Sequence, residues 1–308
     1  MNKIAIIDMG SNTFHLIIAR VWADKWEVLY RTHEAVKIGR GGINNGTILP
    51  EAFDRALTAM RAFRDMADAY GVQEIYAYGT SAIRNARNGT DLARRIEVET
   101  GIRVNIIAGD EEASLIFAGV QAALKLDRTS LVMDIGAGSV EFIVGSDAGV
   151  LWKKSFEIGA QRLVEKFQHH DPIIPDEIAA IDQYLSQALA PLSEAIAVHR
   201  PSVIVGSSGT FDTLSDIFCI RRGIALAHEN AETPLTVEAF YEIYQELIQK
   251  DRAARMAMEG MIELRVDMIV AACCLIRFVL DNYHFTSIRV SSWSLKEGAL
   301  AVISHSFT

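Results

Sequence analysis

Cysteine is scarce in this chain, since only Cys219, Cys273 and Cys274 occur among 308 residues. Their positions match none of the spacings that hold a structural metal, and an odd number this small does not indicate a disulfide framework. We therefore expect three small, buried side chains in a protein of a reducing compartment.

Basic residues are in the minority. The sequence has 30 Lys and Arg against 39 Asp and Glu, which gives a formal net charge of −9, and no basic tail or block offsets it. This balance argues against a general nucleic-acid binder or a binder of anionic membranes. A polyanion could still bind if one groove is locally basic and a metal ion is present.

Long uninterrupted hydrophobic runs are missing, although half of the residues are hydrophobic. The most apolar long stretch, residues 261–280, is predicted to lie in one buried helix, Met261–Asn282. It contains four charged residues, which are Glu263, Arg265, Asp267 and Arg277. No targeting segment is evident, because Asp8 interrupts the first apolar run. We expect no membrane span and a cytoplasmic protein.

The chain does contain a turn motif that occurs twice, in Ile6–Thr13 and in Val132–Ser139. Each copy is an apolar strand that ends in Asp, followed by a turn of small or polar residues and a second apolar strand. Glycine allows such a turn to point successive backbone N–H groups at an anion. The Asp can hold a divalent cation or orient water beside that anion. Two copies predict two phosphate clamps that face each other across a cleft.

The duplication extends beyond these turns. An offset of 126 residues aligns four pairs: Asp8 with Asp134, Gly10 with Gly136, Thr13 with Ser139, and Ile17 with Ile143. A second pair of similar segments, Ile75–Ser81 and Val203–Ser208, follows at nearly the same offset. We infer two homologous half-domains, residues 1–125 and 126–308.

The predicted elements follow the order βββαβαβα, which occurs twice with insertions. This order indicates an α/β protein with two mixed sheets flanked by helices and a ligand site between the halves. Within the second half, Pro175 is expected to open a single long helix that continues to about His199.

Five motifs, in this order along the chain, resemble the exopolyphosphatase/guanosine pentaphosphate phosphatase (Ppx/GppA) family. They are Asp8-x-Gly-Ser-Asn-Thr-Phe, Thr80-Ser81-Ala82-x-Arg84, Glu111-Glu112-Ala113, Asp134-x-Gly-x-Gly-Ser-x-Glu141 and Gly206-x-x-Gly-Thr210. The resemblance covers essentially the whole chain. It implies the actin/Hsp70/sugar-kinase superfold, with duplicated ribonuclease H-like domains and an active site in the interdomain cleft. The end at Thr308 resembles the short, two-domain form of the family.

The resemblance also implies which reaction the protein catalyses and which residues take part in it. The chain is expected to remove terminal phosphate from inorganic polyphosphate, or the 5′ phosphate from guanosine pentaphosphate, with Mg²⁺ or another divalent cation. The family's catalytic Glu falls on Glu112, which would orient or deprotonate the attacking water, and its phosphate-binding Arg falls on Arg84. Asp134 and Glu141 are further catalytic candidates.

The cation and the phosphate are assigned to the turns and the residues that flank them. Asp8, Asp134 and Glu141 are the candidate cation ligands. The phosphate clamp is assigned to Gly10, Ser11, Asn12, Thr13, Gly136, Ala137, Gly138 and Ser139, through backbone N–H groups and hydroxyls. Arg265 and Lys296 are weaker candidates for binding the polyphosphate chain. Residues 206–210 are interpreted as a structural turn.

Two alternatives stay open at this stage. Where the family has the middle one of three consecutive glycines and, further on, a Thr, this chain has Ala137 and Val140, which leaves open a non-catalytic polyphosphate or alarmone sensor. An ATP-dependent kinase of the same superfold is the other alternative. Partners would be polyphosphate and guanosine pentaphosphate but no nucleic acid or membrane, and a homodimer is a further expectation.

Overall fold

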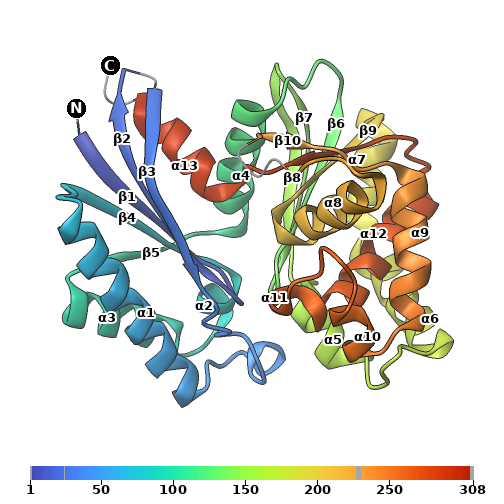
Figure 1. Cartoon of the computed structure of the whole chain (residues 1–308), viewed down its shortest axis with the longest axis horizontal. Coiled ribbons are helices and arrows are strands. Elements are labelled where there is room, and N and C mark those ends of the chain that lie inside the picture. Colours follow the sequence, from blue (N-terminus) through green and yellow to red (C-terminus); the bar gives the residue numbers. More distant parts are fainter. Residues whose placement is uncertain (1, 24, 227–229, 306–308) are drawn as a thin grey trace.

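The computed structural model describes residues 2–23, 25–226 and 230–305, and it contains two mixed β-sheets (Figure 1). The first sheet has the strand order β3-β2-β1-β4-β5 and the second has the order β10-β11-β9-β6-β7-β8. The strands of the first sheet are β1 (Asn2–Met9), β2 (Phe14–Trp22), β3 (Lys25–Glu34), β4 (Glu74–Gly79) and β5 (Val104–Ile106). Those of the second are β6 (Ser130–Ile135), β7 (Val140–Ser146), β8 (Gly149–Phe156), β9 (Val203–Ser207), β10 (Glu232–Thr233) and β11 (Ile288–Ser291).

The two sheets share one pattern of strand pairing. Strand β1 runs antiparallel to β2 and parallel to β4, and β6 runs antiparallel to β7 and parallel to β9. The registers also correspond, because Asp8 lies opposite His15 and Asp134 lies opposite Glu141. Parallel pairing requires a helical crossover, whereas the antiparallel neighbours need only a tight turn. The predicted repeat of strands is confirmed.

The helices cover the faces of both sheets. Those on or beside the first sheet are α1 (Pro50–Ala69), α2 (Ser81–Asn85), α3 (Gly89–Thr100) and α13 (Leu295–Ser304). The others are α4 (Gly109–Ala123), α5 (Ala160–Phe167), α6 (Pro175–Ala188), α7 (Ala190–His199), α8 (Ser208–Arg222), α9 (Val237–Gln249), α10 (Arg252–Met256), α11 (Glu263–Val266) and α12 (Ile269–Tyr283). We call the first sheet with α1, α2, α3 and α13 the first lobe, and the second sheet with the other helices the second lobe.

Helices α4 and α13 lie side by side between the two sheets (Figure 1). Ala299 and Leu300 of α13 join a buried apolar cluster with residues of β1 and β2, whereas α4 contributes to a cluster with Val132 and Ile143 of the second sheet. Each helix therefore packs on the sheet of the other half of the sequence. The division into 1–125 and 126–308 stays a prediction, and this pair of helices crosses it.

The predicted long helix from Pro175 to His199 is wrong, because the chain forms α6 and α7 with a break at Leu189. Pro191 stands in the first turn of α7. Proline has no N–H to donate, and its ring clashes with the carbonyl oxygen four residues earlier in a continuous helix. The same residue is well tolerated where a new helix begins.

The predicted single helix Met261–Asn282 is also wrong. It is divided into the short α11 and the buried α12, with a turn in which the Met268 N–H donates to the Arg265 carbonyl oxygen. The apolar residues of α12 lie in the core of the second lobe, while α11 brings Arg265 to the cleft. A single straight helix could not bury these apolar residues and also bring Arg265 to the cleft. Cys273 and Cys274 are buried and free, as is Cys219, which confirms their expected structural role.

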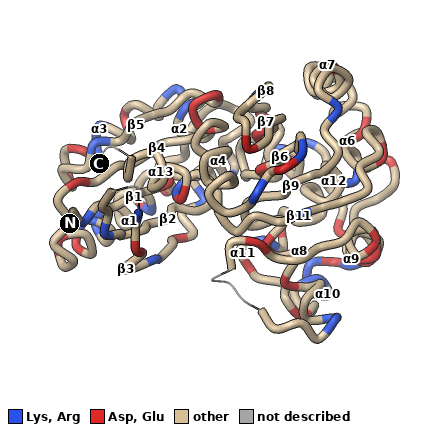
Figure 2. Tube along the Cα trace, turned by 90° about the horizontal axis from the view of Figure 1, so that it is seen from above, with Lys and Arg blue, Asp and Glu red and all other residues tan. Residues whose placement is uncertain are grey.

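The charged residues follow the distribution expected from the composition. Figure 2 shows Lys and Arg interspersed with Asp and Glu along the chain, rather than gathered in one basic stretch. Among the described residues, no helix combines the length and the apolar character needed to cross a membrane.

Replacement of Glu177 by Gln is expected to reduce stability in a pH-dependent way. The buried Glu177 carboxylate accepts hydrogen bonds from the backbone N–H groups of His169, His170 and Ile174 and contacts the His170 ring, which fixes the start of α6. Burial raises its pKa, but these hydrogen bonds outweigh burial and hold the pKa below the ordinary value of 4.5.

A depressed pKa stabilises the folded protein above the pKa of the unfolded chain, and this stabilisation is lost as the pH falls through the folded pKa. Glu177→Gln should therefore cost about 1 kcal/mol at pH 7 and progressively less in acid, as urea unfolding would measure. The exposed Glu194→Gln is the control. A cost that is the same at pH 7 and pH 3 would refute this explanation.

Candidate active site

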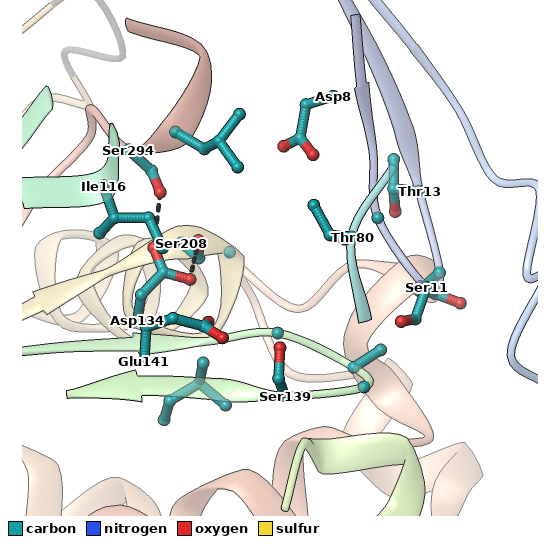
Figure 3. A pocket seen from close by; sticks show the side chains of 18 of the residues that line it. Asp8, Ser11, Thr13, Thr80, Ile116, Asp134, Ser139, Glu141, Ser208 and Ser294 are labelled. Atoms are coloured by element: carbon teal, nitrogen blue, oxygen red, sulfur yellow. Dashed lines mark hydrogen bonds between the residues drawn. The ribbon is translucent and has the colours of Figure 1, made fainter. Parts of the chain in front are cut away.

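The two turns face each other across a cavity of about 140 Å³ between the lobes. Its lining includes all the predicted turn residues, 10–13 and 136–139, and the carboxylates of Asp8, Glu112, Asp134 and Glu141. Figure 3 shows Asp8 and Thr13 of the first lobe opposite Asp134, Glu141 and Ser139 of the second. The structure thus brings together every predicted site residue except Arg84, which is not part of the lining but contacts Glu112.

Each turn closes on itself by the same hydrogen bond. The Gly10 N–H donates to the Thr13 carbonyl oxygen at 3.1 Å, and the Gly136 N–H donates to the Ser139 carbonyl oxygen at 3.0 Å. Both amides are therefore engaged within their turns, and the assignment of Gly10 and Gly136 to the phosphate clamp stays a prediction. The later residues of each turn are left as donors to an anion in the cavity.

The tips of the two turns come into direct contact. A Cβ atom at Gly138 would overlap the Ser11 Oγ atom and lie 2.6 Å from the Ser81 Oγ atom, so this approach requires glycine. The Ser11 hydroxyl also accepts the Ala82 N–H at 3.1 Å, which ties the first turn to α2.

Two serine hydroxyls hold the Asp134 carboxylate. Ser208 Oγ donates to Asp134 at 2.8 Å, and Ser294 Oγ donates to the Asp134 Oδ2 atom at 2.5 Å (Figure 3). Ser208 has φ +70°, a left-handed conformation that is costly outside glycine and is typical of functional sites. The sequence interpretation gave neither serine a role, because it treated the motif at 206–210, which contains Ser208, as a structural turn and singled out Lys296 rather than Ser294 near the C-terminus.

Glu112 lies in the first turn of α4 and is paired with Arg84. Its side chain is only 9% exposed, and Arg84 Nη1 donates to Glu112 Oε2 at 2.7 Å. Burial raises the pKa of Glu112 to about 7, with further raising by the charges of Asp8 and Asp134, while Arg84 opposes the rise. A carboxylate with a pKa near neutrality is suited to accept a proton in a reaction at pH 7.

Asp8 and Glu141 are also buried carboxylates of this cavity. Burial raises the pKa of Asp8 to about 7, although Lys296 lowers it, and burial together with the charges of Glu112 and Asp134 raises the pKa of Glu141 well above its ordinary value. Within the described ranges, no three His, Cys, Asp or Glu side chains lie close enough together to hold a metal ion by themselves. The carboxylates predicted as ligands share the cavity but do not form a closed coordination shell.

Two buried donors in the cavity wall have no protein partner. The Thr13 Oγ1 and Arg265 Nε atoms are buried and make no hydrogen bond within the part of the chain that the structure describes. A buried polar atom without a partner is costly, so both are suited to a polar ligand. Arg265 and Lys296, expected to be weak candidates, both line the cavity.

A second cavity of about 370 Å³ lies beside the first. The two share four lining residues, which are His15, Asp212, Ser292 and Lys296. Arg31 and His33 of β3 form part of its remaining wall. The wall of this second cavity therefore carries both signs of charge, with Arg31 and Lys296 beside Asp212 and Asp216.

Comparisons with known proteins agree with this geometry. The model of the Ppx/GppA phosphatase family matches residues 17–307. A crystallised exopolyphosphatase of Cytophaga hutchinsonii is 43% identical, with 100% of this chain and 99% of that chain covered and a TM-score of 0.96. Exopolyphosphatase 1 of Mycobacterium leprae is 25% identical over 97% of this chain and 88% of that protein.

The Ppx/GppA family member of Aquifex aeolicus shares the fold at 23% identity, with 98% of this chain and 97% of that chain covered and a TM-score of 0.80. The predicted fold class is therefore confirmed as the two-sheet α/β architecture of these structures. Since the family model spans nearly the whole chain and the twin turns occupy one cleft, the chain belongs to the Ppx/GppA phosphatase family.

Proposed function

We propose that this protein is an exopolyphosphatase, which releases terminal orthophosphate from inorganic polyphosphate. The observation that carries the proposal is the placement of both phosphate turns and the Glu112 carboxylate around one cavity. The names of the relatives from Cytophaga hutchinsonii and Mycobacterium leprae support the same activity.

In the proposed reaction, the terminal phosphoryl group lies between the turns. Amides after Gly10 and Gly136 and the hydroxyls of Ser11, Thr13 and Ser139 would bind its non-bridging oxygens. Water attacks the terminal phosphorus and loses a proton to Glu112, while the bond between that phosphorus and the bridging oxygen breaks. The products are orthophosphate and a chain shorter by one phosphate. Arg84 would keep the Glu112 carboxylate oriented toward the water.

The carboxylates of the cavity are suited to a divalent cation that would also bind phosphate oxygens of the substrate. Mg²⁺ commonly takes only one or two protein carboxylates and completes its shell with phosphate oxygens and water. The open arrangement of Asp8, Asp134 and Glu141, without a closed group of three ligands among the described residues, suits this mode. When bound, the cation would neutralise the negative charge that develops on the phosphate oxygens. It would also offset the mutual repulsion of the buried carboxylates.

Removal of divalent cations is expected to abolish phosphate release. Treatment with a chelator should lower the rate at least about 100-fold, and excess Mg²⁺ should restore it, because several buried carboxylates otherwise oppose an anionic substrate. Addition of Mg²⁺ should also raise the unfolding temperature. Phosphate release that is unchanged in the chelator, measured after removal of bound metal, would contradict this role.

Loss of the Ser294 hydroxyl is expected to reduce turnover, in addition to the loss of the N-cap of α13. In Ser294→Ala, the Asp134 carboxylate loses one of its two hydroxyl donors and can rotate, so kcat should fall about tenfold, a loss of about 1.4 kcal/mol. Steady-state phosphate release would measure it. Ser186→Ala, which removes a helix-surface hydroxyl on α6, is the matched control. Equal kcat values in the two variants would show that Ser294 does not position Asp134.

We also propose guanosine pentaphosphate as a second substrate. The neighbouring cavity of about 370 Å³, which Arg31 and Lys296 line beside Asp212 and Asp216, offers room for the part of a longer ligand beyond the terminal phosphate. Location in the cytoplasm and a homodimer remain predictions.

The direct test is phosphate release from long-chain polyphosphate with Mg²⁺, with guanosine pentaphosphate assayed in parallel. Release that depends on time and enzyme concentration is expected. Tight binding of polyphosphate without release would instead indicate a sensor. ATP consumption that depends on an added acceptor would indicate a kinase.

A further inference from the structure

One arginine outside the predicted site holds three separate segments of the cleft. Arg162, in the first turns of α5, uses every nitrogen of its guanidinium group. Its Nε donates to the Gly138 carbonyl oxygen at 2.7 Å, its Nη1 donates to the Ile43 carbonyl oxygen at 2.8 Å, and its Nη2 donates to Glu157 at 3.0 Å. The side chain is only 12% exposed. We propose that Arg162 is a positioning residue that couples closure of the two lobes to the geometry of the hydrolytic site.

The first of these contacts fixes the second phosphate turn. Gly138 lies at the tip of this turn, where it meets Ser11 and Ser81 of the first lobe. A hydrogen bond to its carbonyl oxygen sets the orientation of the adjoining peptide group, whose N–H is the proposed phosphate donor at Ser139. Arg162 therefore orients the second phosphate turn through the backbone and does not itself contact the substrate.

The second contact is part of a clasp between the lobes. We define the clasp as the hydrogen bonds between residues 39–46 of the first lobe and α5 of the second. Besides the bond from Arg162 to Ile43, it includes the Gly41 N–H to Glu165 at 2.8 Å and the Asn44 side chain to the Arg162 carbonyl oxygen at 3.3 Å. In Figure 1 α5 lies in the lower part of the view, whereas α4 and α13, which pack against each other between the two sheets, lie in its upper part. Separation of the lobes at the clasp would break these bonds together.

The third contact connects the clasp to the proposed base. Glu157 of the second lobe binds Arg162 and also accepts Ser81 Oγ at 2.6 Å and Arg84 Nη2 at 3.1 Å from the first lobe. Arg84 in turn donates to Glu112 at 2.7 Å. Arg162, Glu157, Arg84 and Glu112 thus form a chain of alternating charge that is complete only when the lobes are closed.

This arrangement needs a guanidinium group rather than a positive charge alone. The planar fork of arginine presents donors in several fixed directions, whereas a lysine ammonium group at the end of a flexible stem cannot reach acceptors on three segments at once. The inference rests on the proposed function. It predicts that hydrolysis occurs only in the closed form, since the turn, Glu157 and Arg84 lose their alignment when the clasp opens.

The test compares Arg162→Lys with wild type by two readouts. Steady-state phosphate release gives kcat and KM. Fluorescent labels at Val98→Cys and Val198→Cys, two highly exposed positions on α3 and α7, report the separation of the lobes by energy transfer. The three native cysteines are buried and should not be labelled. Arg277→Lys is the control, because Arg277 is a partly buried arginine that pairs with Asp182 and Asp281 away from the cleft.

Arg162→Lys should lower kcat about 10- to 100-fold, as expected for misplaced reacting groups, with KM changed less than about threefold, and should lower energy transfer. Arg277→Lys should change neither. A wild-type kcat in Arg162→Lys, or a loss of kcat without a change in energy transfer, would overturn the coupling. Failure of wild type to release phosphate would instead refute the proposed function, and the label separation would still test the clasp.

Discussion

Glu112→Gln is expected to lower kcat for phosphate release about 100- to 10,000-fold, the usual range for loss of a general base. The glutamine side chain has the same shape and can still accept the hydrogen bond from Arg84, but its amide cannot take a proton from water. The unfolding temperature should change little, since burial disfavours the charge that the substitution removes and Arg84 keeps its ion pair with Glu157.

Glu111→Gln provides the matched control for this result. Glu111 precedes Glu112 in the first turn of α4, but its side chain is exposed and does not line the cavity. Its substitution should leave kcat within about twofold of wild type. If Glu112→Gln retained a third or more of the wild-type kcat, Glu112 would not be the base. Another carboxylate of the cavity would then have to accept the proton.

Gly298→Ala is expected to lower both stability and activity. Helices α4 and α13 cross with their backbones in contact, and a Cβ atom at Gly298 would overlap the Leu115 carbonyl oxygen and lie 2.8 Å from the Gly119 nitrogen. Because these are backbone atoms, the helices must move apart. Overpacking of this kind should cost about 3 kcal/mol of unfolding free energy.

Activity should fall with stability because both helices carry parts of the site. Ser294, which binds Asp134, immediately precedes α13, and Glu112 lies in the first turn of α4. Urea unfolding and phosphate release would measure the two effects. Val302→Ala is the control on α13, since that side chain is 53% exposed and its loss should cost under about 0.5 kcal/mol. An unfolding midpoint of Gly298→Ala equal to wild type would show that the close crossing is not required.

The turns and strands could be predicted because their signals are local. An apolar run that ends in Asp before a glycine turn specifies strand, turn and return strand within a short segment, and the second copy reinforced the first. The breaks at Leu189 and at Met268 were missed for different reasons. Pro191 is a local signal that the interpretation did not use, whereas the end of α11 depends on where Arg265 must lie in the folded protein.

Contacts between distant segments could not be predicted from the sequence. Nothing in Leu295–Ser304 indicates that this helix packs on the first sheet, since an apolar helix face fits either sheet. The serines around Asp134 and the three bonds of Arg162 likewise join residues far apart in the chain. Such partners are ordinary polar residues, and only the fold makes them specific.

The most direct measurement of the central claim is a crystal structure of Glu112→Gln with polyphosphate and Mg²⁺. The account predicts that the terminal phosphoryl group lies between the two turns, within hydrogen-bonding distance of donors at residues 11–13 and at residues 137–139, with the substituted side chain at position 112 beside the attacking face. A polyphosphate chain that ends elsewhere, whether on the surface or against only one of the turns, would contradict it.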